Sequence, residues 1–98
     1  MHPSKDQPAI QMVRTPEYRE NYANSVQVRL SVWDFFLTFG AAEQTSLDSV
    51  TIHNYQGIYL SPQQAKALLH ILRQNVSKYE TTFGEIRLGP WEPGEMIQ

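Results

Sequence analysis

Residues that could carry out chemistry are scattered along this chain of 98 residues. Its three histidines are His2, His53 and His70, and no two of them have the i, i+4 spacing of a helical zinc site. The chain has no cysteine, which excludes disulfides, thiolate zinc sites and cysteine nucleophiles. The sequence therefore predicts no metal site.

Neither the glycines nor the serines form a catalytic or nucleotide-binding motif. The five glycines never give G-x-G-x-x-G or a Walker loop. No serine lies in a nucleophile elbow, and Ser61 is better explained as a helix cap. Asp48 could orient His53 as a general base, but only the residue types suggest it. We expect Asp34 and Glu43 to be charges that keep the strand edge and the loop soluble. We therefore expect no catalytic residue, no bound cofactor and no enzymatic activity.

The remaining candidates are side chains suited to contact another macromolecule. An arginine beside exposed aromatic rings on a sheet can stack single-stranded bases. However, eight basic and ten acidic residues give a net charge of −2, so the basic surplus typical of nucleic-acid binding is missing. We expect these side chains instead to fill a subunit interface or to cover a sheet edge. The predicted interaction residues are Arg29, Phe36, Tyr55, Tyr59 and Ile71.

A long C-terminal helix over residues 62–83 is the most clearly specified element. Ser61 is a helix N-cap, Pro62 takes the first helical position, and Gln64 completes a capping box. Gly84 supplies the positive-φ residue that ends the helix. Apolar residues recur between these ends at the spacing of one helical face. They are Ala65, Leu68, Leu69, Leu72, Val76, Tyr79 and Phe83.

The chain before this helix has the pattern of strands. Apolar residues alternate with polar ones from Val26 to Leu30, which is typical of a strand with one solvated side. Further strands are predicted at residues 9–15, 32–39 and 49–60, with a loop at 41–48 and a bulge or turn at Gly57. No helix separates these strands, which favours antiparallel pairing. The predicted fold is α+β: an antiparallel sheet of about four strands with one long C-terminal helix packed on one face.

Length and composition favour a single domain. We expect a disordered tail at residues 1–8, one domain at 9–88 and a flexible tail at 89–98, with residues 85–88 as a short last strand or arm. No apolar run approaches the ~20 residues of a membrane helix, and the N-terminus lacks the pattern of a signal peptide. We therefore expect a cytoplasmic protein without a membrane partner.

The helix offers more apolar width than one sheet needs, because Ile71 lies beside the main stripe. A second copy of the chain is the simplest way to cover this surplus. The sequence therefore predicts a homo-oligomer, and a dimer is the commonest symmetric solution. Another protein is a further expected partner.

Several motifs resemble a known family. The helix start at residues 61–66 has the pattern S-P-Q-x-A-K, and the helix end at residues 79–86 has Y-E-x-x-F-G-E-I. Together with residues 22–28, 36–40, 60–69 and 74–80, they make residues 9–86 resemble the small bacterial and archaeal family named domain of unknown function 3467. The resemblance implies a prokaryotic domain identity and no catalytic residue. Thr38 departs from the family, in which an acidic residue often stands there.

The predicted function is that of a non-enzymatic protein-binding or scaffolding module. The absence of a chemical motif supports it, as does surplus apolar surface at the interaction residues and at Trp91. One alternative is a single-stranded nucleic-acid-binding protein. Another is a polypeptide-binding, holdase-like module, since a sheet can take up extended segments at its edge.

Overall fold

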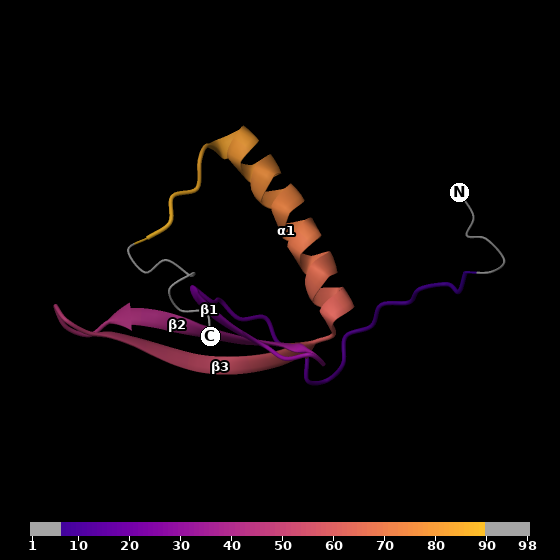
Figure 1. The fold of residues 1–98 in the computed structure, drawn as a ribbon, viewed down its shortest axis with the longest axis horizontal. Coiled ribbons are helices and arrows are strands. Elements are labelled where there is room, and N and C mark those ends of the chain that lie inside the picture. Colours follow the sequence, from indigo (N-terminus) through magenta and orange to yellow (C-terminus); the bar gives the residue numbers. More distant parts are fainter. Residues whose placement is uncertain (1–6, 90–98) are drawn as a thin grey trace.

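The computed structural model describes residues 7–89 and contains three strands and one helix. In chain order they are β1 (Ser25–Leu30), β2 (Phe35–Gln44), β3 (Val50–Leu60) and α1 (Pro62–Phe83), as Figure 1 shows. The strands form one antiparallel sheet in the order β1-β2-β3. The predicted α+β class is confirmed, with three strands where about four were expected. Trp91 and most of both predicted tails lie outside the described residues.

A tight turn at residues 31–34 joins β1 to β2. Ser31 Oγ accepts hydrogen bonds from the backbone N–H groups of Trp33 at 3.1 Å and Asp34 at 3.2 Å. A serine hydroxyl bonded to the following backbone in this way stabilises a turn. The strand predicted at residues 32–39 therefore begins later, and Trp33 lies exposed in the turn.

β2 runs past Gly40, where the predicted strand stops, and ends at Gln44. Residues 41–44 of the predicted loop 41–48 are therefore strand, and the loop is confined to the short connection before β3. Within the strand, Gly40 lies very close to its pairing partner Asn54. A Cβ added at Gly40 would lie 2.6 Å from Asn54 Oδ1, so only glycine fits there without a shift.

The β2–β3 pairing contains one irregularity, between Phe39 and Gly40. Phe39 pairs with Gln56 whereas Gly40 pairs with Asn54, so Tyr55 is the extra residue of a β-bulge. The bulge predicted at Gly57 thus lies two residues earlier, at Tyr55. It changes the direction of the Tyr55 side chain relative to a regular strand.

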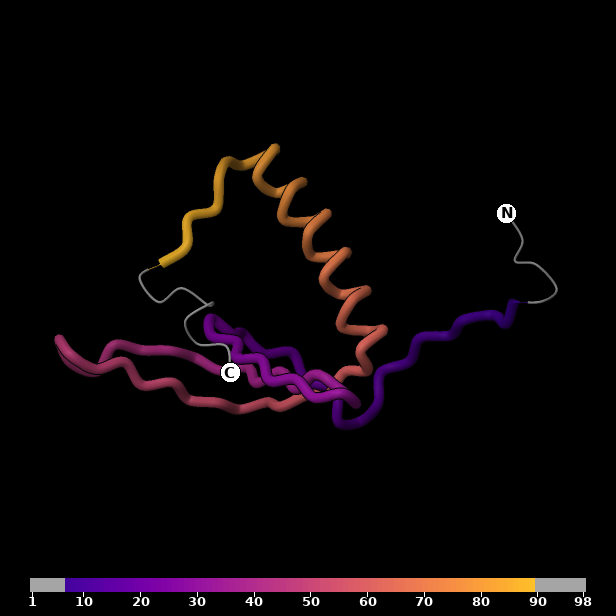
Figure 2. The backbone as a smooth tube through the Cα atoms, viewed as in Figure 1, coloured from indigo at the N-terminus to yellow at the C-terminus, as the bar shows by residue number. Residues whose placement is uncertain are grey.

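Residues 9–15 do not form the predicted strand. They run away from the sheet as an extended arm, and Met12 is 92% exposed (Figures 1 and 2). The chain then turns back, with the Tyr18 N–H donating to the carbonyl of Thr15 at 3.0 Å. The apolar pattern of a strand is present, but the arm does not pair with the free edge of β1 or of β3.

α1 begins and ends where the sequence predicts. The backbone N–H of Gln64 donates to Ser61 Oγ at 3.1 Å, which satisfies one of the free donors at the helix start. At the other end Gly84 has φ +112°, and its N–H donates to the carbonyl of Glu80 at 3.0 Å. Residues 85–88 continue without strand pairing.

α1 diverges from the sheet instead of lying along it (Figures 1 and 2). Leu72 remains 52% exposed and Phe83 73% exposed, and no apolar side chain in residues 7–89 is buried. The radius of gyration is 17.3 Å, against about 13 Å for a compact domain of this length. The expected packing along one face is thus limited to the start of α1. Only Ser61 separates β3 from α1, which leaves the chain little freedom to fold the helix back.

Candidate interaction surfaces

The sheet has two chemically different faces. Side chains alternate between the faces along each strand, so successive rows of paired residues point in opposite directions. One row is Arg29, Phe36 and Tyr59, and the next is Val28, Leu37 and Ile58. We call the face that contains Leu37 and is turned toward α1 the inner face, and the opposite one the outer face.

An apolar groove of about 620 Å³ lies between the inner face and the first half of α1. Lys66 is the one charged residue among those that line it, and its methylene chain can lie along an apolar wall. Apart from Lys66, the groove is lined by apolar residues, so it suits an apolar occupant. The sheet contributes Val26, Val28, Phe35, Leu37 and Leu60, and the helix contributes Pro62, Ala65, Lys66, Leu68, Leu69 and Leu72.

The apolar stripe of α1 continues beyond the groove. Val76, Tyr79 and Phe83 are all exposed, and the rings of Tyr79 and Phe83 lie beside each other with centroids 5.0 Å apart and a tilted arrangement. Ile71, a predicted interaction residue, is also exposed and does not line the groove. The second half of α1 is therefore an apolar surface without cover from residues 7–89.

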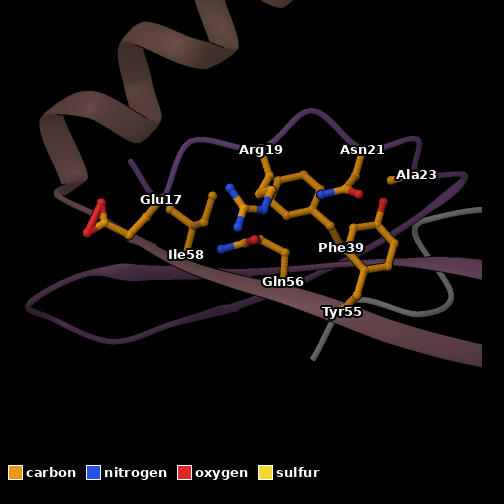
Figure 3. Close-up of a pocket in the computed structure, with 8 residues that line it drawn as sticks. All are labelled: Glu17, Arg19, Asn21, Ala23, Phe39, Tyr55, Gln56 and Ile58. Carbon is orange, nitrogen blue, oxygen red and sulfur yellow. The ribbon is translucent and has the colours of Figure 1, made fainter. Parts of the chain in front are cut away.

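A second, smaller groove of about 290 Å³ lies on the same side of the sheet, where residues 17–23 cross β3 (Figure 3). The bulge turns Tyr55 toward this segment, and the Tyr55 hydroxyl donates a hydrogen bond to the carbonyl of Tyr22. Tyr55 therefore lies on the inner side, away from Arg29, Phe36 and Tyr59, with which the sequence grouped it. The groove is lined by Glu17, Arg19, Asn21, Ala23, Phe39, Tyr55, Gln56 and Ile58.

Asn24 fastens the segment 17–23 to the end of β2. Its Oδ1 accepts from the Ala42 N–H at 2.7 Å, and its Nδ2 donates to the Ala42 carbonyl at 3.4 Å. The Asn24 N–H also donates to the carbonyl of Gly40 at 3.1 Å. A side-chain amide here replaces the pairing that another strand residue would give, so β1 is anchored before its first residue.

On the outer face Phe36 lies between two neighbours in its row. The Arg29 guanidinium carbon lies 4.8 Å from the centroid of the Phe36 ring, and the Tyr59 ring centroid is 4.5 Å away. The Phe36 ring also covers Gly57, where an added Cβ would lie 2.7 Å from Phe36 Cζ. Three of the five predicted interaction residues thus form one outer row, which we define as Arg29, Phe36 and Tyr59.

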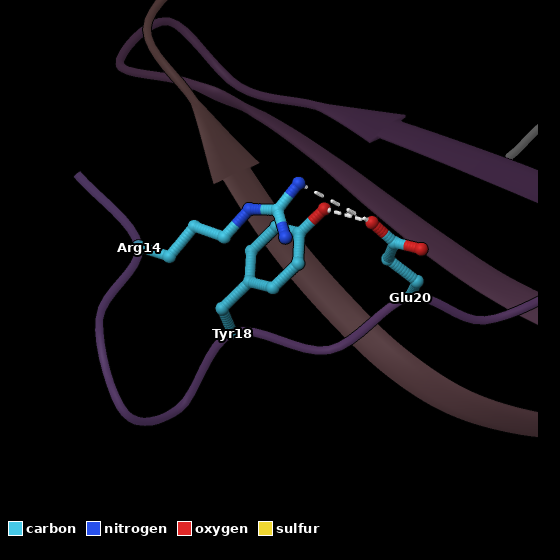
Figure 4. Close-up of polar contacts among 3 residues, drawn as sticks. All are labelled: Arg14, Tyr18 and Glu20. Carbon is cyan, nitrogen blue, oxygen red and sulfur yellow. Dashed lines mark hydrogen bonds and ion pairs between the residues drawn. The ribbon is translucent and has the colours of Figure 1, made fainter. Parts of the chain in front are cut away.

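A polar cluster stabilises the turn that precedes the segment 17–23 (Figure 4). The Tyr18 hydroxyl donates to Glu20 Oε2 at 2.6 Å, and Arg14 Nη2 lies 3.8 Å from the same oxygen. The hydrogen bond to Glu20 raises the pKa of Tyr18 above its ordinary value, because a phenolate there would face a carboxylate, and slight desolvation acts in the same direction. All three side chains lie at the surface.

Within residues 7–89, no group of three or more histidine, aspartate or glutamate side chains is placed to hold a metal ion. His53 and Asp48 belong to different parts of the β2–β3 hairpin, and Asp34 is engaged by the turn, where its Oδ1 accepts from Ser31 Oγ at 3.3 Å. The same residues contain no helix with the length and apolar character needed to span a bilayer.

Comparison with protein-family models places nearly the whole described chain in one family. A family model described as "Protein of unknown function (DUF3467)" matches residues 1–88. The chain belongs to the DUF3467 family. No curated protein and no solved structure matches this DUF3467 chain. The resemblance noted in the sequence is confirmed, and the family description adds no active site to the surfaces above.

Proposed function

We propose that this DUF3467 chain is a non-enzymatic, homo-oligomeric module that binds or scaffolds other proteins. The observation that carries the proposal is the unburied apolar surface, since no apolar side chain of residues 7–89 is buried. Removal of apolar surface from water is the main favourable term in folding. A chain of this shape is therefore stable when a partner covers its inner face and α1.

The amount of open surface supports a large interface. The accessible surface is 9168 Å², whereas a compact monomer of 11.3 kDa exposes about 5,700 Å² by the general scaling with mass. Obligate homodimers commonly bury a total of about 2,000–5,000 Å². The surplus on each chain is thus sufficient for an interface of the obligate kind.

The outer face is the surface that such an assembly leaves for other proteins. Its row combines an arginine with two aromatic rings, and Tyr59 is 66% exposed. Arginine and tyrosine are enriched where binding energy concentrates in protein interfaces. The exposed Val32 and Trp33 in the β1–β2 turn lie at one end of the same hairpin. We place the contacts with other proteins on this face.

Light scattering coupled to size exclusion tests the proposal. At micromolar concentration we expect a mass at least twice the 11.3 kDa of one chain. We also expect the midpoint of thermal unfolding to rise with protein concentration, because association stabilises the folded state by mass action. A folded monomer whose midpoint is independent of concentration contradicts the proposal.

A second candidate function is binding of single-stranded nucleic acid on the outer face. The observation in its favour is the outer row itself, since an exposed aromatic ring beside an arginine can stack a base. The net charge of −2 opposes it. A gel shift with single-stranded oligonucleotides at low salt tests it: Tyr59→Ala should abolish the shift and Tyr18→Ala, in the distant turn, should preserve it. No shift of the unsubstituted protein excludes this function.

A further inference from the structure

We infer that the apolar groove holds the second half of α1 from another copy of this chain, so that two copies exchange helices in a two-fold dimer. The inference rests on the proposed homo-oligomer and specifies its interface.

The first argument is that groove and helix are complementary within a single sequence. Leu72 is the last helix residue that lines the groove, so the part of α1 with Val76, Tyr79 and Phe83 extends past it. This part has an apolar stripe and no sheet to cover it, while the groove between the inner face and the first half of α1 is apolar and open. Each chain thus supplies both an open site and the element that fits it.

The second argument concerns why α1 does not close onto its own sheet. The strand-to-helix connection is the single residue Ser61, and its Oγ is bonded to the Gln64 N–H. Rotating α1 onto its own inner face would require different backbone dihedral angles at this single-residue junction. Short, fixed connections of this kind favour exchange of an element between copies.

A two-fold dimer is also a closed assembly, with no open surface left for a third copy. A two-fold arrangement places each helix in the groove of the other copy, so both open surfaces are covered at once. A head-to-tail arrangement that does not close into a ring would leave one groove and one helix open at its ends, and a two-fold dimer is the smallest closed solution. In the two-fold dimer, two helices lie between two inner faces, and the two outer rows remain on opposite surfaces.

Cross-linking tests the inference directly, because the chain has no native cysteine. Val28→Cys marks the inner face and Val76→Cys marks the second half of α1. When the two single variants are mixed, unfolded and refolded together, a short bis-maleimide should link one to the other. A double variant carrying both cysteines should give a covalent dimer, whereas a helix closed on its own sheet would give a monomer with an internal link.

A matched control uses Gln27→Cys in place of Val28→Cys, since adjacent strand residues face opposite sides of the sheet. We expect at least about tenfold less linked product with Gln27→Cys, because its thiol points away from the groove. The mass of each single variant is first measured by light scattering. If Val28→Cys no longer assembles, Val26→Cys replaces it, because Val26 lines the same groove.

The outcomes separate the inference from the proposal on which it rests. A dimeric mass without a link between Val28→Cys and Val76→Cys overturns helix exchange and leaves the homo-oligomer standing. A monomeric mass overturns both. A predominant internal link in the double variant shows that α1 covers its own sheet and overturns the exchange. Formation of the covalent dimer, with the control unlinked, supports it.

Discussion

The two faces of the sheet are built from the same three strands, yet their side chains make different contacts within the chain. On the outer face, Phe36 has Arg29 and Tyr59 as neighbours in its own row, and its ring covers Gly57. On the inner face, aliphatic residues such as Leu37 line a groove that stays open. Large planar side chains can cover one another across strands, whereas short aliphatic ones need a second layer above them.

In the proposed homo-oligomer, the inner face is the surface that assembly covers and the outer face is the one left free. Removing the apolar groove on the inner face from water would stabilise the chain in proportion to the area that is covered. Substitutions on the inner face should therefore act on the mass of the assembly, and those on the outer face on local stability or on ligand binding. Adjacent residues of one strand point to opposite faces, so a pair of neighbouring substitutions tests this distinction at nearly the same place in the sheet.

The largest effect is expected for a charge on the inner face. Leu37→Asp places a carboxylate in the apolar groove, where an unpaired charge is strongly disfavoured. We expect loss of the assembly and of cooperative unfolding, measured by light scattering and circular dichroism. The control is Thr38→Asp, on the opposite side of the same strand, which should keep the mass and cost about 1 kcal/mol or less. Equal damage from both variants would remove the distinction between the faces.

A moderate effect is expected for Gly57→Ala on the outer face. The new Cβ would lie 2.7 Å from Phe36 Cζ, so the ring must move from its place beside Tyr59. We expect a loss of about 1–3 kcal/mol in urea unfolding, the usual cost of overpacking, with an unchanged assembly mass.

The control is a double-mutant cycle with Phe36→Leu, in which the smaller side chain leaves room for the new methyl group. If Gly57→Ala costs the same in both backgrounds, contact with the ring is not its cause.

The features predicted from the sequence are those set by residues close together in the chain. The cap at Ser61, the positive φ at Gly84 and the alternation in β1 each depend on neighbours within a few positions, and each is present. The bulge at Tyr55 was misplaced because it depends on the approach of Gly40 to Asn54 from another strand. Short-range sequence patterns do not predict such contacts between strands.

The arm at residues 9–15 and the direction of α1 were also missed. An apolar alternation indicates that a segment could pair, but pairing requires a neighbouring edge, and the described chain leaves this arm unpaired. Among the predicted interaction residues, Arg29, Phe36 and Tyr59 converge because regular pairing places them in one row. Tyr55 does not join them, since the bulge turns it to the inner side.

A smaller effect is expected for Asn24→Ala, which tests the part of the inner side that the chain covers itself. The substitution removes both side-chain hydrogen bonds to Ala42, so the Ala42 N–H loses Asn24 Oδ1 as its acceptor. We expect a loss of about 1–2 kcal/mol and faster hydrogen exchange at the Ala42 amide, with no change in mass. Asn21→Ala, in the same small groove, is the control and should leave that exchange rate unchanged. Slow exchange at Ala42 in both variants would show that Asn24 does not anchor the segment.

The smallest effect is expected for Arg29→Met, which keeps most of the side-chain length and removes the cation above Phe36. An exposed cation–π contact contributes about 0.5–1 kcal/mol, so urea unfolding should shift by no more than this. Arg14→Met, which removes a similar contact with Tyr18 in the surface turn, provides the matched control. Because the outer row lies opposite the groove, the mass of the assembly should stay constant in both variants. Dissociation of the Arg29→Met protein, with the Arg14→Met protein intact, would mean that the outer face also belongs to the subunit interface. The two faces would then share one role, and the surface available to another protein would have to lie elsewhere on the chain.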